Sequence, residues 1–397
     1  IKKRIVLKVS DYRSSIIQGK FFAKKGLWVS EFRIESGLNC GGHAFASDGF
    51  LMGPILDEFR KKKDELVESL QKAYNSALTS LGRKTFAEPH PVKITAQGGI
   101  GTYNEDKFLL DFYQLDGTGW ASPFLLVPEV TNVDLPTLDR LSQAKEEDLY
   151  LSEVSPLGVP FNNLRGNFSD AEKERKAEIG KPGSACPRGH LVSNTEFTDK
   201  PICTASRQYQ KLKVDQLESL NLPKSEFEHQ YNKVAVKACI CNDLGEPAFI
   251  NGKASKNGVQ RFSAVCPGPN LAYFTKVSSL QSMIDHIYGR ASLLNGTYRP
   301  NMFIKELKMY IDYFIKEVKK ASPSPSEKQI KYLNEFAQNM FEGIEYYREL
   351  FPNMLAESNE YRERTLSELQ SYQKKLEEFI SKHTNIFSQH LSKLIPA

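Results

Sequence analysis

The first part of the chain alternates short apolar runs with one long amphipathic stretch. Apolar runs at residues 5–9, 27–34 and 92–95 have the length and composition of strands. Between the last two, residues 55–81 repeat apolar positions with a period close to 3.6, which predicts an amphipathic helix. We therefore expect α/β structure over residues 1–150, with this helix packed on a sheet. The apolar positions of the helix are Leu56, Phe59, Leu66, Leu70 and Ala73.

The last part of the chain, residues 281–397, has a helical pattern throughout. Three apolar runs advance mainly in steps of three and four residues, which predicts three helices. Ser-Pro-Ser-Pro at 322–325 and Pro352 supply the breaks between them. We interpret the region as a three-helix packing unit, with a partner-binding coiled coil as the alternative. The runs contain Leu307, Ile311, Phe314 and Val318, then Ile330, Leu333, Met340, Ile344 and Tyr347, and finally Leu366, Leu369, Leu376 and Ile380.

The middle of the chain, residues 151–280, gives few regular signals apart from a strand-like run at 233–240. It is rich in Gly, Pro, Asn and Ser, and it holds five of the six cysteines. A loop-rich segment of this length in a compact protein usually carries function or is held together by a bound group.

Composition narrows the classes of protein that the chain can belong to. It has 397 residues, 40% hydrophobic and 25% charged, with a net charge of +5, as in ordinary globular proteins of two to three domains. Apolar stretches such as 123–127 are far shorter than the roughly 18–20 residues of a membrane helix, and no secretory signal pattern opens the chain. The charge balance does not support nucleic-acid binding. We expect a cytoplasmic protein without membrane or nucleic-acid partners, whose cysteines are free thiols or metal ligands.

The strongest local motif is a strand that runs directly into a glycine-rich turn. Residues 92–102 read Val-Lys-Ile-Thr-Ala-Gln-Gly-Gly-Ile-Gly-Thr, and a helical pattern follows from Glu105. Small residues let backbone N–H groups approach an anion, and the helix adds its positive N-terminal end. The functional interpretation is a phosphate cradle, and the alternative is only a tight turn.

A second short strand ending in small residues follows at 115–125, Leu-Asp-Gly-Thr-Gly-Trp-Ala-Ser-Pro-Phe-Leu. In a (β/α)₈ barrel the loops after strands seven and eight commonly form one phosphate site. Two such strand ends, separated by a single helix, fit that arrangement.

These two motifs together resemble the last two strands of FMN-binding barrels of the nitronate monooxygenase family, which includes the flavin-dependent enoyl-acyl-carrier-protein reductases. The match runs through residues 96–102, Asp116-Gly117 and 121–124; Leu115 replaces the family's Ala, and Ala121-Ser122 replaces its Gly-Thr. The resemblance implies a (β/α)₈ TIM-barrel-type flavin domain, FMN as cofactor, and a small-molecule or acyl-thioester substrate. The residues it implies for FMN are Gly41, Gly42, Gln97, Gly98, Gly99, Gly101, Thr102, Gly119, Ala121 and Ser122.

The family's other motif is Glu-Ala-Gly-Gly-His, and residues 34–43, Ile-Glu-Ser-Gly-Leu-Asn-Cys-Gly-Gly-His, are similar to its end. By resemblance His43 becomes the catalytic base or substrate-orienting group near the flavin. Imidazole suits that task because its ordinary pKa of about 6.5 lets it exchange a proton near neutrality. The alternative is a histidine that satisfies a turn. Asn39 and Cys40 depart from the family's Glu-Ala.

The position of the motifs implies that only the C-terminal strands of a barrel are present. A barrel of about 250 residues averages ~31 per βα unit, which puts strand seven near residue ~190. Here it starts near residue 92. A second polypeptide or an upstream segment would then complete the barrel, unless the resemblance misleads.

The clustered cysteines suggest a second cofactor. Cysteine beside Pro and Gly in loops is typical of thiolate ligands to iron–sulfur clusters. Neither ferredoxin spacing nor a zinc-ribbon pair is present, so a cluster, a zinc ion and unligated thiols all remain open. Glutamate synthases, flavin barrels of another branch, carry a cluster beside FMN. The candidate ligands are Cys186, Cys203, Cys239, Cys241 and Cys266.

Together these features predict an FMN-dependent oxidoreductase with a barrel-type flavin domain, a cysteine-rich middle region and a helical C-terminal domain. It would reduce an activated C=C bond or oxidise a nitronate-like carbon acid, with a cluster relaying electrons. The alternatives are a non-catalytic partner subunit of a larger flavin assembly, and a metal- or cluster-binding protein without flavin.

Overall fold

The fold is mixed α/β, built on one parallel sheet. The structure is a computed structural model and describes residues 3–245, 264–294, 296, 298–321, 324–354 and 357–387. The sheet has the order β1-β2-β3-β4, with every neighbouring pair parallel. No barrel closes within these residues, so the α/β character is confirmed and the TIM barrel stays a prediction. The strands are β1 (Ile5–Val9), β2 (Val29–Glu35), β3 (Lys93–Gln97) and β4 (Gly117–Gly119).

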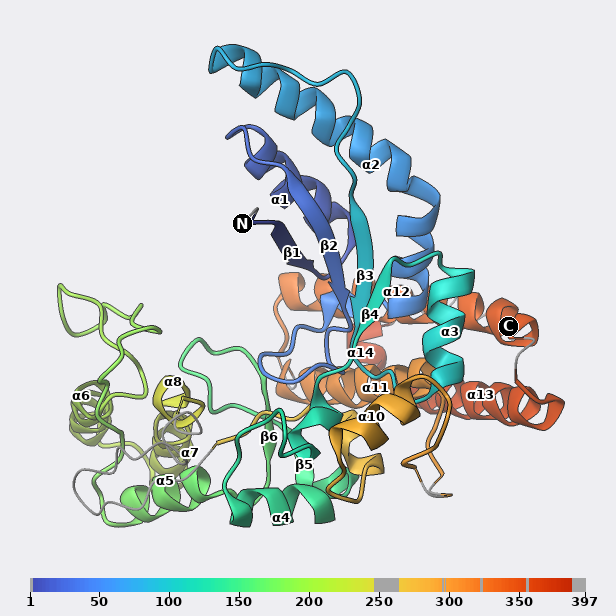
Figure 1. Cartoon of the computed structure of the whole chain (residues 1–397). Coiled ribbons are helices and arrows are strands. Elements are labelled where there is room, and N and C mark those ends of the chain that lie inside the picture. The colour runs from blue at the N-terminus through green and yellow to red at the C-terminus, as the bar shows by residue number, and fades with distance from the viewer. Residues whose placement is uncertain are drawn as a thin grey trace.

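Helices connect successive strands: α1 (Tyr12–Ala23), α2 (Met52–Ser80) and α3 (Tyr103–Phe112). The helix expected over 55–81 is thereby confirmed, and in Figure 1 its C-terminal end projects beyond the sheet. α1 packs closely against both α2 and the sheet. A Cβ on its Gly19 would lie 2.8 Å from Leu70 and 3.0 Å from Phe32, so only glycine fits there without displacement.

The sheet has one apolar face and one polar face. Side chains alternate along β2, so Phe32 and Ile34 are fully buried while their neighbours Glu31, Arg33 and Glu35 point to the other side. The apolar face belongs to a core shared with α1 and α2. On the polar face Glu31 accepts hydrogen bonds from Arg33 and from Thr95 of β3.

The C-terminal helices continue the core of the sheet. They are α11 (Met302–Ala321), α12 (Glu327–Leu350), α13 (Asn359–Ser381) and the short α14 (Thr384–Phe387). In Figure 1 they lie across the end of the sheet at which the strands finish. Their buried side chains form one cluster with those of the strands. The three predicted helices are confirmed; Pro352 lies in the turn between α12 and α13, and Ser322 and Pro323 of the other break lie outside the described residues.

The middle region contains more helix than its composition suggests. The strand expected at 233–240 is wrong, because residues up to Ala235 finish helix α7 and α8 begins at Ile240. Val234 and Ala235 are buried on the last turn of α7, so tertiary packing overrides the β propensity of this run. The elements of the region are α4 (Leu135–Gln143), β5 (Leu149–Ser152), β6 (Phe161–Leu164), α5 (Phe168–Glu178), α6 (Arg207–Ser219), α7 (Lys224–Ala235), α8 (Ile240–Asp243) and α10 (Leu280–Ile287).

The helices of the described ranges were compared with the length and hydropathy of membrane-spanning helices. Not one of them combines the length and the apolar character that crossing a bilayer requires.

A buried carboxyl group joins the helical region to the sheet. Glu306 of α11 accepts hydrogen bonds from the Ser36 hydroxyl at 2.6 Å, the Met52 amide at 2.8 Å and the Tyr347 hydroxyl at 3.3 Å. Complete burial nevertheless raises its pKa to about 7, because the low-dielectric interior disfavours the charged form. The contribution of this group to stability is therefore sensitive to pH near neutrality.

We expect the protein to lose stability as the pH rises through about 7. A carboxyl whose folded-state pKa is raised binds a proton more tightly when folded, so its contribution is full below the ordinary pKa and is lost above the raised one. Between pH 5 and pH 8 the loss should be roughly 2–3 kcal/mol, measured by urea unfolding. The Glu306→Gln variant should lack this part of the pH dependence, and an unchanged slope in the variant would contradict the assignment.

Candidate functional site

A cavity of about 320 Å³ lies at the carboxyl ends of β2, β3 and β4. Ligands of open α/β sheets and barrels bind at this edge. The cavity brings together predicted cofactor residues from three separate turns, Gly41, Gln97, Gly98, Gly99, Gly119, Ala121 and Ser122. The other lining residues are Glu35, Asn39, Cys40, Ile100, Trp120, Pro123, Leu125, Cys266 and Asn270.

The turn after β3 forms one wall of the cavity, and its shape requires glycine. Gly98 and Gly99 have φ angles of +106° and +81°, a region that side chains disfavour. A Cβ on Gly99 would also lie 2.1 Å from the Asn39 amide nitrogen, and one on Gly98 would lie 2.6 Å from the Cys40 sulfur. The two glycines thus let the loop after β2 lie directly against the turn after β3.

The opposite wall is a distant segment that the strand ends hold in place. The carbonyl oxygen of Cys266 approaches so closely that a Cβ on Gly41 would lie 2.3 Å from it. Two residues on, the Gly268 amide donates to the Ser122 hydroxyl oxygen at 2.7 Å. Since that hydroxyl accepts this bond, its own proton stays available to donate elsewhere.

Beneath the cavity a buried ion pair fixes the turn after β3. Arg299 pairs with Glu105 at 2.7 Å and donates to the Asn270 side chain at 2.8 Å and to the Gly99 carbonyl. Asn270 in turn donates to the Ile100 carbonyl at 2.8 Å. The cavity floor is therefore a cross-linked unit of three chain segments.

The structure does not bring Gly101 and Thr102 of the predicted phosphate turn to the cavity. The Gly101 amide donates to the Glu105 carboxylate at 2.9 Å, and the Thr102 hydroxyl caps α3 by accepting from the Glu105 amide. Neither residue lines the cavity. The carboxylate of Glu105 thus accepts one of the amide protons at the start of α3 that a phosphate would otherwise accept.

His43 and Gly42 also lie beside the cavity rather than on its lining. The His43 Nε2 is 2.7 Å from the Ser155 hydroxyl, and its ring packs edge-on against Phe161. Burial lowers the pKa of His43, and the nearby Lys8 adds to that effect. The Gly42 carbonyl accepts the Asn162 amide at 2.8 Å. His43 therefore contacts Ser155 in this structure, and its predicted role beside a flavin stays a prediction.

Among the described residues the cavity lining is neutral to acidic, since none of those that line it is Lys or Arg. The carboxylate in the lining belongs to Glu35. It forms an ion pair with Lys8 at 2.5 Å and accepts a hydrogen bond from the side-chain amide of Gln97 at 2.8 Å. Burial raises the pKa of the Cys40 and Cys266 thiols, so both stay protonated at neutral pH. The lining therefore favours a planar polar group over a free anion.

Two features of the lining fit a flavin ring. The side-chain oxygen of Asn39 is buried without a hydrogen-bond partner among the described residues, and Asn39 lines the cavity. Such an orphan acceptor calls for a donor from a ligand, and a flavin ring carries one N–H. The side chains of Gln97 and Trp120, which also line the cavity, would give a flavin ring a polar and an aromatic neighbour. A flavin phosphate would have to lie at the turn after β4, beside Ser122.

The predicted metal ligands divide into two groups. Cys266 lines the cavity, and its sulfur accepts the Gly42 amide. Cys186, Cys203, Cys239 and Cys241 interact with one another away from the cavity. Across the described part of the chain, no three His, Cys, Asp or Glu side chains are placed closely enough to hold a single metal ion.

Several supporting residues could not have been selected from sequence. Asn270 follows a Cys-Pro-Gly-Pro turn, which marks a sharp bend but not a cavity wall. Arg299 stands in no motif, and its buried partners come from segments nearly two hundred residues away. Trp120 stands inside the second motif and is the large aromatic side chain among its small residues.

No family model matches the chain, and no curated protein gives a significant match.

Proposed function

We propose that the protein is an FMN-dependent oxidoreductase that binds the flavin in the cavity at the carboxyl ends of β2, β3 and β4. The observation that carries the proposal is the meeting of three sequence-distant turns, each rich in small residues, around one cavity. Its volume of about 320 Å³ falls at the lower end of ordinary ligand sites. Bound flavin would supply hydride transfer.

The sheet supports a barrel-type flavin domain. Its strands follow one another in sequence order, all parallel, as neighbouring strands of a (β/α)₈ barrel do. Its apolar face is covered by α1 and α2, whereas the other face carries Lys8, Glu31, Arg33, Glu35 and Gln97. Parallel sheets are normally covered on both faces, so further strands or a partner would cover the polar one.

The chain's own residues would bind and orient the flavin. Gly98 and Gly99 would let the ring approach the backbone, Asn39 and Gln97 would bond its polar edge, and Ser122 would donate to the phosphate. The substrate would be either an activated C=C bond to be reduced or a nitronate-like carbon acid to be oxidised. Cys40 and Cys266 are the two lining thiols that stay protonated beside this site, and either can donate a proton there.

The test is flavin binding by the purified full chain. The protein is incubated with FMN, desalted, and examined by visible absorption and by quantification of the flavin released on denaturation. We expect stoichiometric bound flavin. A chain that retains its far-UV circular dichroism but binds no flavin would overturn the proposal.

A matched pair of glycine variants locates the site. Gly99→Ala places a Cβ against Asn39 at a positive φ, so flavin affinity should fall roughly tenfold or more, which is ~1.4 kcal/mol or more. Gly117→Ala is the control, because its Cβ would lie 3.7 Å from Thr95, an ordinary contact. Equal affinity in both variants would place the flavin elsewhere.

The polar sheet face also favours a second candidate, a non-catalytic partner subunit of a larger flavin assembly. In that role Glu31, Arg33 and Thr95 would meet another protein rather than complete this chain's own site. Light scattering on the same preparation separates the candidates. A flavin-loaded monomer would exclude the partner-subunit function, and a flavin-free complex would favour it.

A further inference from the structure

A second cavity, of about 280 Å³, lies between α11 and the antiparallel pair of strands β5 and β6. Among the described residues, none lines both this cavity and the one at the strand ends. The residues of α11 that line it run from Lys305 to Lys320 at the spacing of a single helix face. That stretch corresponds to about 22 Å along the helix axis. The cavity is therefore elongated along α11.

Two lysines and one glutamate form the end of the cavity nearest the start of α11. The Nζ atoms of Lys305 and Lys308 lie 2.7 Å and 2.6 Å from the same carboxylate oxygen, Oε2 of Glu146. The other carboxylate oxygen of Glu146 accepts a hydrogen bond from the Tyr273 hydroxyl. Two cations thus share one carboxylate, which leaves an excess of positive charge at this end.

Burial strengthens the effect of this excess charge. The Lys305 side chain is only 7% exposed, and Lys308 is partly buried beside it. Burial lowers the pKa of Lys305, and the neighbouring charge of Lys308 adds to that effect, although the pairing with Glu146 opposes it. A buried ammonium group that shares its counter-ion is stabilised by a further anion, because charges removed from water are weakly screened. This end of the cavity therefore favours an anionic group.

The middle of the cavity is lined by apolar side chains from both walls. Asp312, which also lines this stretch, is paired with Lys375 of α13 at 2.7 Å. Apolar walls favour a hydrocarbon chain over water. The apolar residues of this part are Leu149, Leu151, Met309 and Tyr313.

The far end of the cavity carries charges that are in contact with water. Lys316 and Lys320 lie 3.6 Å and 3.1 Å from a carboxylate oxygen of Glu153, and Lys320 also pairs with Glu317 at 3.1 Å. Both lysine side chains are 50% exposed, so water and salt screen their charges. The unscreened positive charge is thus at the Lys305 end, and the Lys320 end opens toward solvent.

We propose that this cavity binds an aliphatic monocarboxylate of medium chain length. The carboxylate lies beside Lys305 and Lys308, where it neutralises the charge that Glu146 leaves over. The alkyl chain extends past Met309 toward Lys316. Lys308 and Lys316 are about 12 Å apart along the helix axis, which suits an extended chain of medium length.

The new site lies beside the cavity proposed for the flavin but does not depend on it. Pro269 lines the new cavity, and its neighbour Asn270 lines the cavity at the strand ends. The two cavities are therefore adjacent at this segment, whereas the lysines and the apolar walls belong to the new cavity alone. A chain that failed to bind FMN would leave the carboxylate site untouched.

The experiment is equilibrium dialysis of the full chain, without FMN, against hexanoate, octanoate and decanoate below micelle-forming concentrations. We expect a single site per chain, with an affinity that rises roughly fourfold for each added methylene group. Decanol has the same chain without the charge, so it should bind roughly tenfold or more weakly than decanoate. An affinity independent of chain length, or equal binding of decanol, would overturn the proposal.

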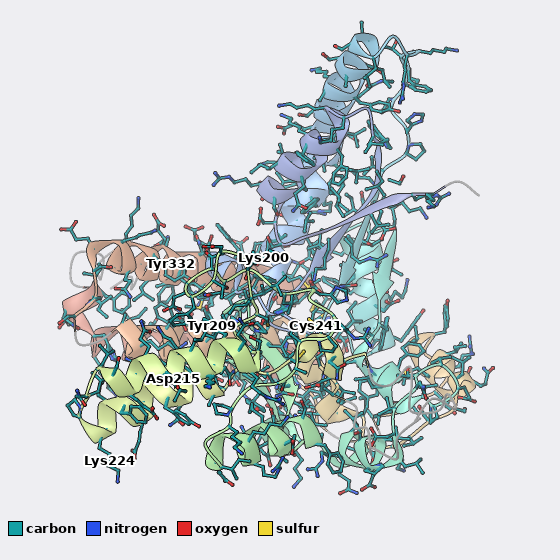
Figure 2. All side chains as sticks on the ribbon, turned by 90° about the vertical axis from the view of Figure 1, so that its left-hand side faces the viewer. Lys200, Tyr209, Asp215, Lys224, Cys241 and Tyr332 are labelled. Carbon is teal, nitrogen blue, oxygen red and sulfur yellow. The ribbon has the colours of Figure 1, made fainter. Side chains whose placement is uncertain are left out.

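Lysine variants locate the carboxylate. Lys305→Met and Lys308→Met should each weaken decanoate binding roughly tenfold or more, with far-UV circular dichroism as the check on folding. Lys224→Met is the matched control and should bind decanoate as the wild type does. Figure 2 shows Lys224 at the outer end of α7, and its side chain is 91% exposed.

A second readout on the wild-type chain does not depend on the folding of variants. Bound decanoate should slow the reductive methylation of Lys308 but not that of Lys224, as measured by peptide mass spectrometry. Unchanged methylation of Lys308, or an equal loss of affinity in Lys224→Met and Lys308→Met, would mean that the carboxylate binds elsewhere.

Discussion

Replacing Arg299 with methionine is expected to lower the free energy of unfolding by about 3–5 kcal/mol. Its guanidinium and the Glu105 carboxylate are almost completely buried, with side-chain exposures of 4% and 1%. Loss of the cation leaves a buried carboxylate that only the amides of Gly101 and Met302 still neutralise in part. It also leaves the Asn270 side-chain oxygen and the Gly99 carbonyl without their donor. Urea unfolding measures the loss.

Two variants calibrate this result. Arg299→Lys keeps the charge but not the fork of donors, so an intermediate loss is expected. Arg175→Met removes a cation from an exposed pair with Glu172, with exposures of 58% and 46%, and should cost about 0–1 kcal/mol. A loss below roughly 1 kcal/mol in Arg299→Met would mean that the turn after β3 does not depend on this ion pair.

The elements that could be predicted from sequence are those in which one buried apolar face sets the spacing of the hydrophobic residues. The helix over 55–81 has one apolar stripe against α1 and the sheet, and β1 occupies the predicted residues 5–9. The strand predicted at 233–240 was wrong because the alternation of apolar and polar residues in this run spans the end of helix α7 and the loop that follows it. Its conformation depends on the upstream start of α7 at Lys224 and on the burial of Val234 and Ala235.

The candidate site was predictable where the backbone itself demands small residues. Gly98, Gly99 and Gly41 stand out in sequence because nothing larger fits their turns, and the same turns line the cavity. Gly101 and Thr102 share that composition but have a structural task, since Glu105 occupies the helix end. No local pattern shows whether a residue of this turn lines the cavity or supports the turn. The residue that fixes the turn, Arg299, lies nearly two hundred residues later in the chain.

The grouping of the cysteines shows the same limit. Their loop settings indicated ligands, but sequence spacing gave no reason to separate Cys266 from the other four. The separation follows from tertiary contacts, the Gly41–Cys266 approach on one side and the Gln210 bridge on the other. The bridge made by the buried Gln210 thus joins the loops of Cys203 and Cys239, which sequence spacing does not reveal.

Replacing Phe336 with alanine is expected to cost about 3–5 kcal/mol, the range for removing a buried aromatic side chain. Its ring is 1% exposed and lies 5.5 Å from that of Phe314 and 5.9 Å from those of Tyr313 and Tyr332. The rings come from α11 and α12, so the cavity left behind would weaken the contact between these helices. The variant should unfold at lower urea concentration, with an unchanged dependence on urea.

An exposed phenylalanine provides the matched control. Phe21→Ala on α1 removes the same atoms from a ring that is 57% exposed, so a change within about 0.5 kcal/mol is expected. Because α12 also packs against the loop before α2, with the Phe336 carbonyl 2.4 Å from where a Cβ on Gly49 would lie, the damage should spread to the sheet. Loss of near-UV circular dichroism from the aromatic cluster, in step with a single unfolding transition, would show that helices and sheet unfold as one core. Two separated transitions would instead mean that the shared core divides near residue 300.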